Sequence, residues 1–304
     1  MKIIKATRVY KAELPAADLL RKHLEELTFS DISEHEYSRS GFVPAPGSPD
    51  GDLVTALSGG YALGMRYDEK IVPAASVKAA TAKRAEEIHA AQGYAVGRKQ
   101  LRELRDEVFH EMLKVALHRT TVVPIFYDPA SHLLLVCTTS EKLADLAMRN
   151  LIKVVGSIKT TTIHIAELKG GLTARLRDQV FTAENKFGAF TLGGSFWLKL
   201  DKEKVTIESS VSEEDSGPLR EALESSLQVE ALRLSLGPVA FKLSSDFVFR
   251  SVSFEAPEEE ESFETMADAW MHEAAVQLKL MVGAIEQLCE LVGYTPPEED
   301  DFND

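Results

Sequence analysis

A long run of helix-forming residues interrupts the β-strand pattern of this chain and most constrains its fold. Residues 76–91 and 98–117 have helical patterns with glycines between them, and Ser76 is placed to cap the first helix. Strand-like sequence stands on both sides, YALGMR before the run and TTVVPIFYD after it. We therefore expect residues 74–119 to form a helical arm inserted into a sheet domain.

The sequence around this arm predicts an α+β layer, because strands and helices follow one another without the strict alternation of a doubly wound sheet. Ser58-Gly59-Gly60 predicts a hairpin turn, and Ser140 predicts the start of a helix that reaches about Val155. The other expected elements are a strand in 2–14, a helix at 16–27, strands at 53–57, 61–66, 120–128 and 132–139, and a strand at 160–168.

A second α+β region is expected after the Lys169-Gly170-Gly171 break. Its predicted elements are a helix at 172–180, strands at 189–192, 196–200 and 204–208, two or three antiparallel strands in 229–254, and a helix at 264–292. The predicted fold class is thus α+β, with antiparallel or mixed sheets, packed helices, the inserted arm and a long C-terminal helix. The predicted domains are 1–73 with 120–169, 74–119 and 170–292, followed by an acidic disordered tail at 293–304.

The composition is that of a soluble globular protein, with 44% hydrophobic and 27% charged residues. No run of 18 apolar residues and no signal-peptide pattern occur, so the expected location is the cytoplasm, without membrane contact. Cys137 and Cys289, the two cysteines, have the surroundings of small buried hydrophobic residues rather than a redox pair.

The net charge of −14 is unevenly distributed. Residues 255–304 hold 15 acidic residues and one basic residue, Lys279, so this segment alone carries −14 and residues 1–254 carry no net charge. A neutral body can present a basic face to a polyanion, because the local field decides such binding. The acidic end serves solubility, or keeps DNA away from one side of the protein.

The second arm helix carries a basic row beside an apolar one. Arg98, Arg102, Arg105 and Phe109 fall within roughly 60° of one another on a helical wheel, and Lys99 adds a further charge. Such a row suits the phosphate backbone of a nucleic acid. The alternative is a solvated helix face whose cations pair with nearby acidic residues of the same helix.

Several ordered blocks resemble the bacterial RdgC family of recombination-associated proteins. They are IIKATRVYKAEL, GFVPAPGSPDGDLVTALSGGYAL with the following RYDEKIVP, RDEVFHEML, and LLLVCTTSEKLADLAMRNLIKVVGSI. The resemblance implies a non-catalytic, sequence-independent DNA-binding protein of the nucleoid. It also implies a homodimer closed into a ring around double-stranded DNA, with single-stranded DNA as a further ligand, and functional antagonism of RecA.

The resemblance also bears on individual residues. In the arm, Arg98 and Arg105 match the residue types of the family, and Arg119 keeps the family's positive charge. Leu117, by contrast, stands where the family has an aromatic residue. Leucine can make an arm contact but cannot stack on a base; ordinary helix-end packing is the alternative. In the second region, Lys199 matches a family lysine, and Lys202 and Lys204 follow it around a tight turn, with strand alternation expected to put Lys202 and Lys204 on one face. Protection of an edge strand is the alternative there.

Enzyme signatures are missing from the sequence. His110-Glu111 begins like a zinc-protease motif but lacks the second histidine, and the glycine pairs lack the rest of a phosphate loop. We therefore predict no catalytic residues, no metal and no cofactor. A competing hypothesis is an acidic protein-interaction module, a DNA mimic or adaptor that uses the C-terminal end and does not bind DNA.

Overall fold

The computed structural model describes residues 2–49, 51–156, 160–163, 168–209, 216–255 and 263–294. Its helices are α1 (Ala17–Glu25), α2 (Ala74–Gln92), α3 (Arg98–Val115), α4 (Glu141–Val155), α5 (Leu168–Thr182), α6 (Gly217–Glu224) and α7 (Met266–Val292). Its strands are β1 (Thr7–Ala12), β2 (Ser38–Val43), β3 (Thr55–Leu57), β4 (Gly60–Lys70), β5 (His118–Asp128), β6 (Leu133–Val136), β7 (Thr160–Thr162), β8 (Thr191–Leu200), β9 (Glu203–Glu208), β10 (Gln228–Leu236), β11 (Val239–Ser244) and β12 (Val248–Phe254).

A single sheet joins the two halves of the chain. Within the described ranges it has twelve strands, in the order β2-β4-β5-β6-β1-β12-β11-β10-β8-β9, with β3 on β4 and β7 on β1. All of these pairings are antiparallel, as the hairpin patterns predict. The connection runs through β1, which pairs with β6 along one edge and with β12 along the other. The predicted domain boundaries stay predictions, but one sheet includes strands from both sides of the boundary predicted at residues 169–170.

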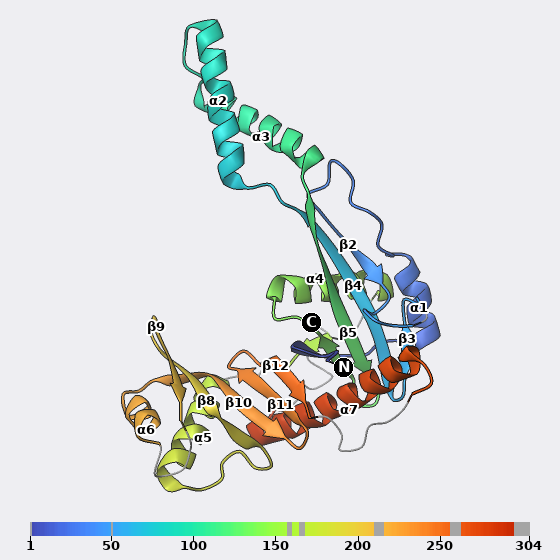
Figure 1. Ribbon diagram of the computed structural model, residues 1–304, viewed down its shortest axis with the longest axis vertical. Coiled ribbons are helices and arrows are strands. Elements are labelled where there is room, and N and C mark those ends of the chain that lie inside the picture. Colours follow the sequence, from blue (N-terminus) through green and yellow to red (C-terminus); the bar gives the residue numbers. More distant parts are fainter. Residues whose placement is uncertain are drawn as a thin grey trace, which may run out of the picture.

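Helices cover the two faces of this sheet unequally. On one face, α5 and α7 pack against strands of both halves and bury a large core that includes Phe196, Leu232 and Phe241. On the other face, α1 and α4 cover only the strands of the N-terminal half, around Leu63 and Ile125. Among the described residues, no helix covers the face of β8 to β12 that points away from α5 and α7. This face lies on the inner side of the curve that the molecule describes (Figure 1).

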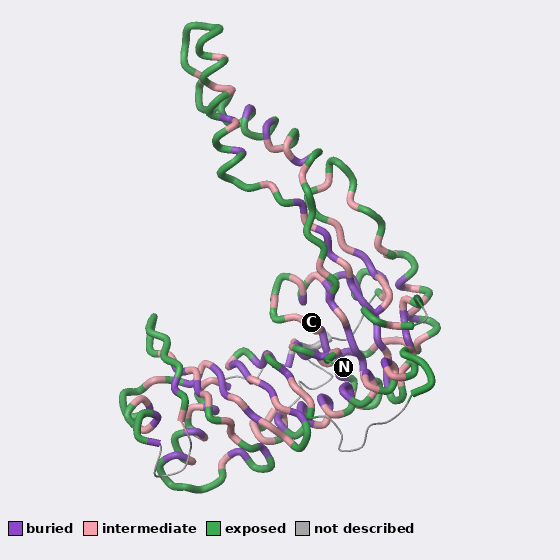
Figure 2. Tube along the Cα trace, viewed as in Figure 1, coloured by how far each residue is buried: buried purple, intermediate pink, exposed green. Residues whose placement is uncertain are grey.

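The arm projects from the far end of the N-terminal strands (Figure 1). Helix α2 leaves β4 after Pro73, and α3 returns into β5, so both connections are at one end of the same strand pair. Along most of its length the arm is exposed, in contrast to the strands below it (Figure 2). Its internal packing rests on a few buried residues, Val77, Thr81, Leu104, Val108 and Leu113.

The α+β fold class is confirmed, including the helical arm and the long C-terminal helix. Ser140 does cap α4, accepting a hydrogen bond from the Leu143 amide at 3.4 Å. Two local predictions are wrong. Pro73, and not Ser76, occupies the N-cap of α2. Gly170 and Gly171 do not break the chain but lie in the first turn of α5, which starts at Leu168.

The predicted pair of strands around Gly193-Gly194 is also wrong, because β8 runs through both glycines as one strand. The pairing of β8 with β10 is irregular beside them, with a register shift between Leu232 and Leu234. A Cβ at Gly193 would lie 2.9 Å from the Cβ of Arg233, so the glycine gives this arginine room on the sheet. The predicted tail from residue 295 lies outside the described residues.

Candidate nucleic-acid interface

Three basic side chains lie side by side across the uncovered face of the sheet. Arg233 on β10 is the cross-strand partner of Lys242 on β11, and Lys242 is the partner of Arg250 on β12. Their strand neighbours Leu232, Phe241 and Phe249 belong to the core on the opposite face, so alternation turns all three cations toward the open side. Like charges directly opposite one another destabilise a sheet. An anion bound across this row would offset that repulsion.

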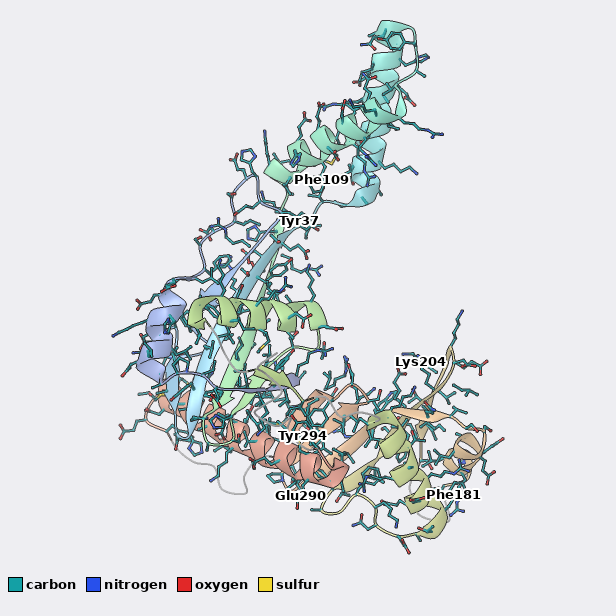
Figure 3. All side chains as sticks on the ribbon, turned by 180° about the vertical axis from the view of Figure 1, so that it is seen from behind. Tyr37, Phe109, Phe181, Lys204, Glu290 and Tyr294 are labelled. Carbon is teal, nitrogen blue, oxygen red and sulfur yellow. The ribbon has the colours of Figure 1, made fainter. Side chains whose placement is uncertain are left out.

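Further cations extend the row along both edges. Lys199 and Lys204 are cross-strand partners on β8 and β9, on the same face as Trp197. At the other edge, Arg8 on β1 is the partner of Val248 on β12. Lys204, near the β8–β9 turn, lies on the opposite side of these strands from Glu290 of α7 (Figure 3). The basic surface defined by these residues therefore faces the inner side of the curve.

The carboxylates on this surface are paired with its outer cations. Glu230 Oε1 lies 2.9 Å from Lys204 Nζ, and Asp246 Oδ2 lies 3.5 Å from Arg8 Nη2. The ion pair lowers the pKa of Glu230, chiefly through the hydrogen bond from Lys204. Within the described part of the chain, no carboxylate lies within 4 Å of the side-chain nitrogens of Lys242 or Arg250. The centre of the row thus keeps its charge available for a ligand.

Lys242 lies between an aromatic ring and a second cation. Its Nζ lies 3.2 Å from the ring centroid of Trp197, a cation–π contact, and both side chains are half-buried. Burial lowers the pKa of Lys242, and the positive charge of Arg250 lowers it further. Arg250 itself donates from Nε to Ser244 Oγ at 2.9 Å.

The sequence-predicted lysines of this region are only partly brought together. Lys199 and Lys204 do share one face, as cross-strand partners. Lys202 does not share it by strand alternation, because residues 201 and 202 form the turn between β8 and β9. Asp201 in this turn has a φ of 49°, a left-handed conformation that aspartate tolerates better than most residues. Lys202 is exposed at the tip of the hairpin.

Helix α4 adds two exposed cations where it covers the N-terminal strands. Arg149 and Lys153 are one helical turn apart, on the side of α4 opposite its buried residues Ala147 and Leu151. Figure 1 shows α4 on the inner side of the curve. The sequence analysis did not single out either residue.

The predicted basic row of the arm is exposed along α3. Arg98, Lys99, Arg102 and Arg105 are all exposed, beside the buried Leu104 and Val108. Of these four cations only Lys99 has a carboxylate within reach among the described residues, Glu103 at 3.9 Å. The alternative, in which neighbouring carboxylates neutralise the row, therefore describes Lys99 alone.

Phe109 does not extend this row as a free aromatic surface. Its ring is half-buried and packs against Tyr37, with 6.1 Å between the ring centroids (Figure 3). The loop before β2 thus reaches the base of the arm and packs against this ring, and a place for Phe109 beside a polyanion stays a prediction.

Leu117 and Arg119 lie where the arm joins the sheet. Leu117 is 81% exposed and follows the end of α3, so the alternative of helix-end core packing is wrong. Val115, at 84%, and Ile71, at 51%, are exposed close by in the chain and in space, since the Ile71 amide donates to the Leu117 carbonyl at 2.8 Å. Arg119 is exposed on β5, as the cross-strand partner of Glu69.

A buried ionic cluster fixes the strands at this junction. The Asp68 side chain is 1% exposed and accepts from Arg66 Nε at 3.0 Å and Nη2 at 2.7 Å, while His118 Nε2 lies 3.3 Å away. Burial alone would raise the pKa of the Asp68 carboxyl, but hydrogen bonds from Arg66 and Thr120 hold it below its ordinary value. Asp68 therefore keeps its charge where the arm begins.

Lys70 ties the arm to the body from the same strand. This side chain is only 5% exposed, and its Nζ donates to the carbonyls of Glu34 at 2.7 Å and of Leu113 at 2.9 Å. Leu113 is in the last turn of α3, whose final carbonyls have no partner within the helix. The ammonium thus caps the returning arm helix and the loop before β2 together.

The described residues contain no group of three or more His, Cys, Asp or Glu side chains that could hold a metal ion. In the same ranges no helix is long and apolar enough to cross a membrane. Cys137 and Cys289 are free and partly buried. Burial raises the pKa of the Cys289 thiol to about 11, and it raises the pKa of Cys137 as well. Both thiols are therefore protonated near neutral pH, which fits the packing role that the sequence predicts.

Comparison with known proteins identifies the family. A family model described as "Putative exonuclease, RdgC" matches residues 3–293. The chain belongs to the RdgC family. One RdgC relative, a recombination-associated protein from Burkholderia ambifaria, is 27% identical over 238 residues, 78% of this chain and 76% of its own length. Another of the same name, from Tolumonas auensis, is 32% identical over 142 residues, 47% of each chain.

A third RdgC relative, from Burkholderia cenocepacia, is 32% identical over 150 residues, 49% of this chain and 48% of its own length. Two of these three matches thus span only about half of the relative's length. All three relatives are named recombination-associated proteins, which agrees with the resemblance seen in the sequence blocks.

Sequence analysis missed the central cations of the sheet. Arg233, Lys242 and Arg250 stand singly in three separate strands, each at an outward position of an alternating pattern. The sequence predicted the strands but assigned none of these three residues to a face. What brings them together is the register of the strands, which the alternation alone does not determine.

Proposed function

We propose that this RdgC-family protein is a non-catalytic, sequence-independent DNA-binding protein. In this proposal two copies close into a ring around duplex DNA and restrain RecA-mediated recombination. The observation that carries the DNA-binding part is the row of Arg233, Lys242 and Arg250 on an uncovered sheet face at the inner side of the curve. Arginine and lysine bind phosphates without regard to base sequence.

The net charge of −14 does not oppose this proposal, because the charges are segregated. The 15 acidic residues of the C-terminal segment include those of α7, which packs on the opposite face of the sheet. A duplex approaching the inner side meets the basic surface before the carboxylates of α7, whose long-range repulsion is screened beyond about 8–10 Å at physiological salt. A ring would add residence time without stronger single contacts.

The test is fluorescence anisotropy of a labelled random-sequence duplex at several salt concentrations. We expect the triple variant Arg233→Gln, Lys242→Gln, Arg250→Gln to bind less tightly and to lose up to roughly 2.7 from the slope of log K against log salt, about 0.9 for each phosphate contact. The arm variant Arg98→Ala, Arg102→Ala, Arg105→Ala measures the contribution of α3 in the same assay.

A matched pair of single substitutions separates a specific surface from general charge. Lys242→Gln and Lys279→Gln each remove one ammonium, the first from the basic surface and the second from the exposed side of α7. We expect only the first to change the salt slope. Equal effects would contradict the proposed surface, and a wild-type protein that fails to bind duplex even at low salt would refute DNA binding and favour the acidic interaction module.

The ring is tested by topology. A closed ring bound to circular duplex should resist a high-salt wash and should be released when a restriction enzyme linearises the DNA. Sedimentation at several protein concentrations measures the dimer directly. Release at the same salt from circular and linear DNA would contradict encirclement. Inhibition of RecA strand exchange, lost in the triple sheet variant, is the expected effect on recombination.

The description of the family model favours a second candidate, an exonuclease. It predicts loss of nucleotides from the ends of linear DNA in the presence of Mg²⁺ or Mn²⁺. Incubation of end-labelled linear duplex and single strand with each ion decides between the two. Labelled mononucleotides that appear in proportion to protein concentration would refute the non-catalytic part of the proposal.

A further inference from the structure

A pocket in the basic surface, between Lys204 at its edge and the central Lys242 and Arg250, has the chemistry of a nucleotide site. It measures about 620 Å³, within the range of small-ligand sites, and opens between β8, β9, β10, β11 and the loop before β12. Its lining combines an aromatic ring, cations and hydroxyl groups, from Trp197, Lys204, Thr206, Lys242, Ser244 and Arg250. A flat phosphate-binding surface would not need the ring.

The charges inside the pocket favour an anion at one position. Lys242 and Arg250 are cross-strand partners, and neither has a carboxylate within 4 Å among the residues described. The two carboxylates that line the pocket, Glu230 and Asp246, are instead paired with Lys204 and Arg8 at its rim. A phosphate between Lys242 and Arg250 would thus meet two unopposed cations, one of them half-buried beside Trp197.

The Lys242 ammonium covers one face of the Trp197 ring, with its Nζ 3.2 Å from the ring centroid. The lysine stem is flexible, and a phosphate beside Arg250 would attract the ammonium away from the ring. The face exposed in this way is suited to a nucleic-acid base, because bases stack on aromatic side chains without regard to sequence. Bases inside an intact duplex are stacked on each other and cannot do so.

We propose that this pocket binds one unpaired nucleotide of DNA, with its phosphate between Lys242 and Arg250 and its base on Trp197. This inference rests on the proposed function and adds a preference to it: the sheet surface contacts duplex backbone, whereas the pocket takes nucleotides from single strands, gaps or frayed ends.

The test compares two substitutions that differ in the aromatic face. Trp197→Phe keeps a flat ring on the sheet and Trp197→Leu does not. Anisotropy is measured with a labelled oligothymidylate and with a duplex closed by a loop at each end. For Trp197→Leu we expect affinity for oligothymidylate to fall roughly 5- to 150-fold, the range for loss of one stacked base. Trp197→Phe should nearly retain it, and both variants should bind the closed duplex as the wild type does.

Tryptophan emission gives a second, direct measurement. The chain has two tryptophans, and Trp270 is 3% exposed, so a change in emission on adding oligothymidylate is assigned to Trp197 if Trp197→Phe abolishes it. Thymidine monophosphate should compete for this change, and inorganic phosphate should compete far more weakly. Equal competition by the two would overturn base stacking.

The outcomes separate this inference from the proposed function. Equal affinities of wild type, Trp197→Phe and Trp197→Leu for oligothymidylate, with duplex binding intact, overturn the pocket and leave duplex binding in place. Loss of both DNA forms in the folded Trp197→Leu variant also overturns it, because the ring then supports the whole surface. Absence of any DNA binding by the wild type overturns both. Should Trp197→Leu fail to fold, the emission change in the wild type, its loss in Trp197→Phe and its competition by thymidine monophosphate still decide the question.

Discussion

Replacing Lys70 by methionine should loosen the arm from the body. Methionine retains the apolar stem but cannot donate to the carbonyls of Glu34 and Leu113, which the Lys70 ammonium reaches at 2.7 and 2.9 Å. Each hydrogen bond from a charged donor contributes about 1.5–3 kcal/mol. The substitution also removes the free-energy cost of burying an ammonium, which offsets part of this loss. We expect a net cost of about 2–4 kcal/mol.

The cost should be local, so hydrogen exchange at the base of the arm is the appropriate assay. The Ile71 amide, which donates to the Leu117 carbonyl at 2.8 Å, and the Ala116 amide are the reporters. A local cost of 2 kcal/mol or more corresponds to a roughly 30-fold or larger loss of protection. Amides of β10 and β11, far from the arm, should keep theirs.

The matched control is Lys83→Met, which removes an exposed ammonium from α2. Its effect on stability should stay within about 0.5 kcal/mol, as for most surface substitutions. Unchanged exchange at Ile71 in Lys70→Met, or equal changes in both variants, would refute the role assigned to this lysine.

Three further predictions concern the sheet, a loop and the acid response. Lys204→Ala should change the free energy of unfolding by less than about 1 kcal/mol, because its ion pair is exposed, but should lower the salt slope of duplex binding by about 0.9; an unchanged slope would contradict its place in the interface. In urea unfolding, Gly47→Ala should destabilise the protein more than Gly51→Ala. Both glycines have positive φ, but only at Gly47 would a Cβ lie 2.7 Å from the Trp270 ring. Equal losses of stability would count against this contact. The lowered pKa of Asp68 contributes stability above the ordinary carboxyl pKa near 3.9, and this stability is lost as pH falls through the lower pKa of the folded state. Asp68→Asn should therefore be less stable than the wild type at pH 7. Below about pH 4, its melting temperature should change less with pH than that of the wild type.

The sequence predicted the elements of this fold where local signals were strong. Ser140 marks the start of α4, Gly59 the turn of the first hairpin, and the apolar positions of α3 its extent, because each signal acts within a few residues. The predicted break at Gly170 and Gly171 was wrong, because packing of Leu172 and Leu176 in the core overrides the low helix propensity of the two glycines.

The candidate site was less predictable, for a related reason. The exposure of Arg98, Arg102 and Arg105 follows from helical periodicity and could be expected. The grouping of the sheet cations depends on long-range register, and the cover over Phe109 depends on a loop seventy residues earlier in the chain. Neither has a signature in the surrounding sequence. Alternation indicates which face a residue occupies, but not which residues share that face across strands.

The position of β1 has a consequence for synthesis of the protein. Synthesis makes this strand long before its partner on one edge, β12, which begins at Val248. The amides of Ile3 and Ile4 likewise gain their hydrogen-bond acceptor only when α7 is made, because the side-chain oxygen of Gln277 accepts from both. Until β12 and α7 have been made, the nascent protein carries an unpaired strand edge, the kind of surface on which aggregation begins. Newly made chains should therefore benefit from chaperones that shield this edge.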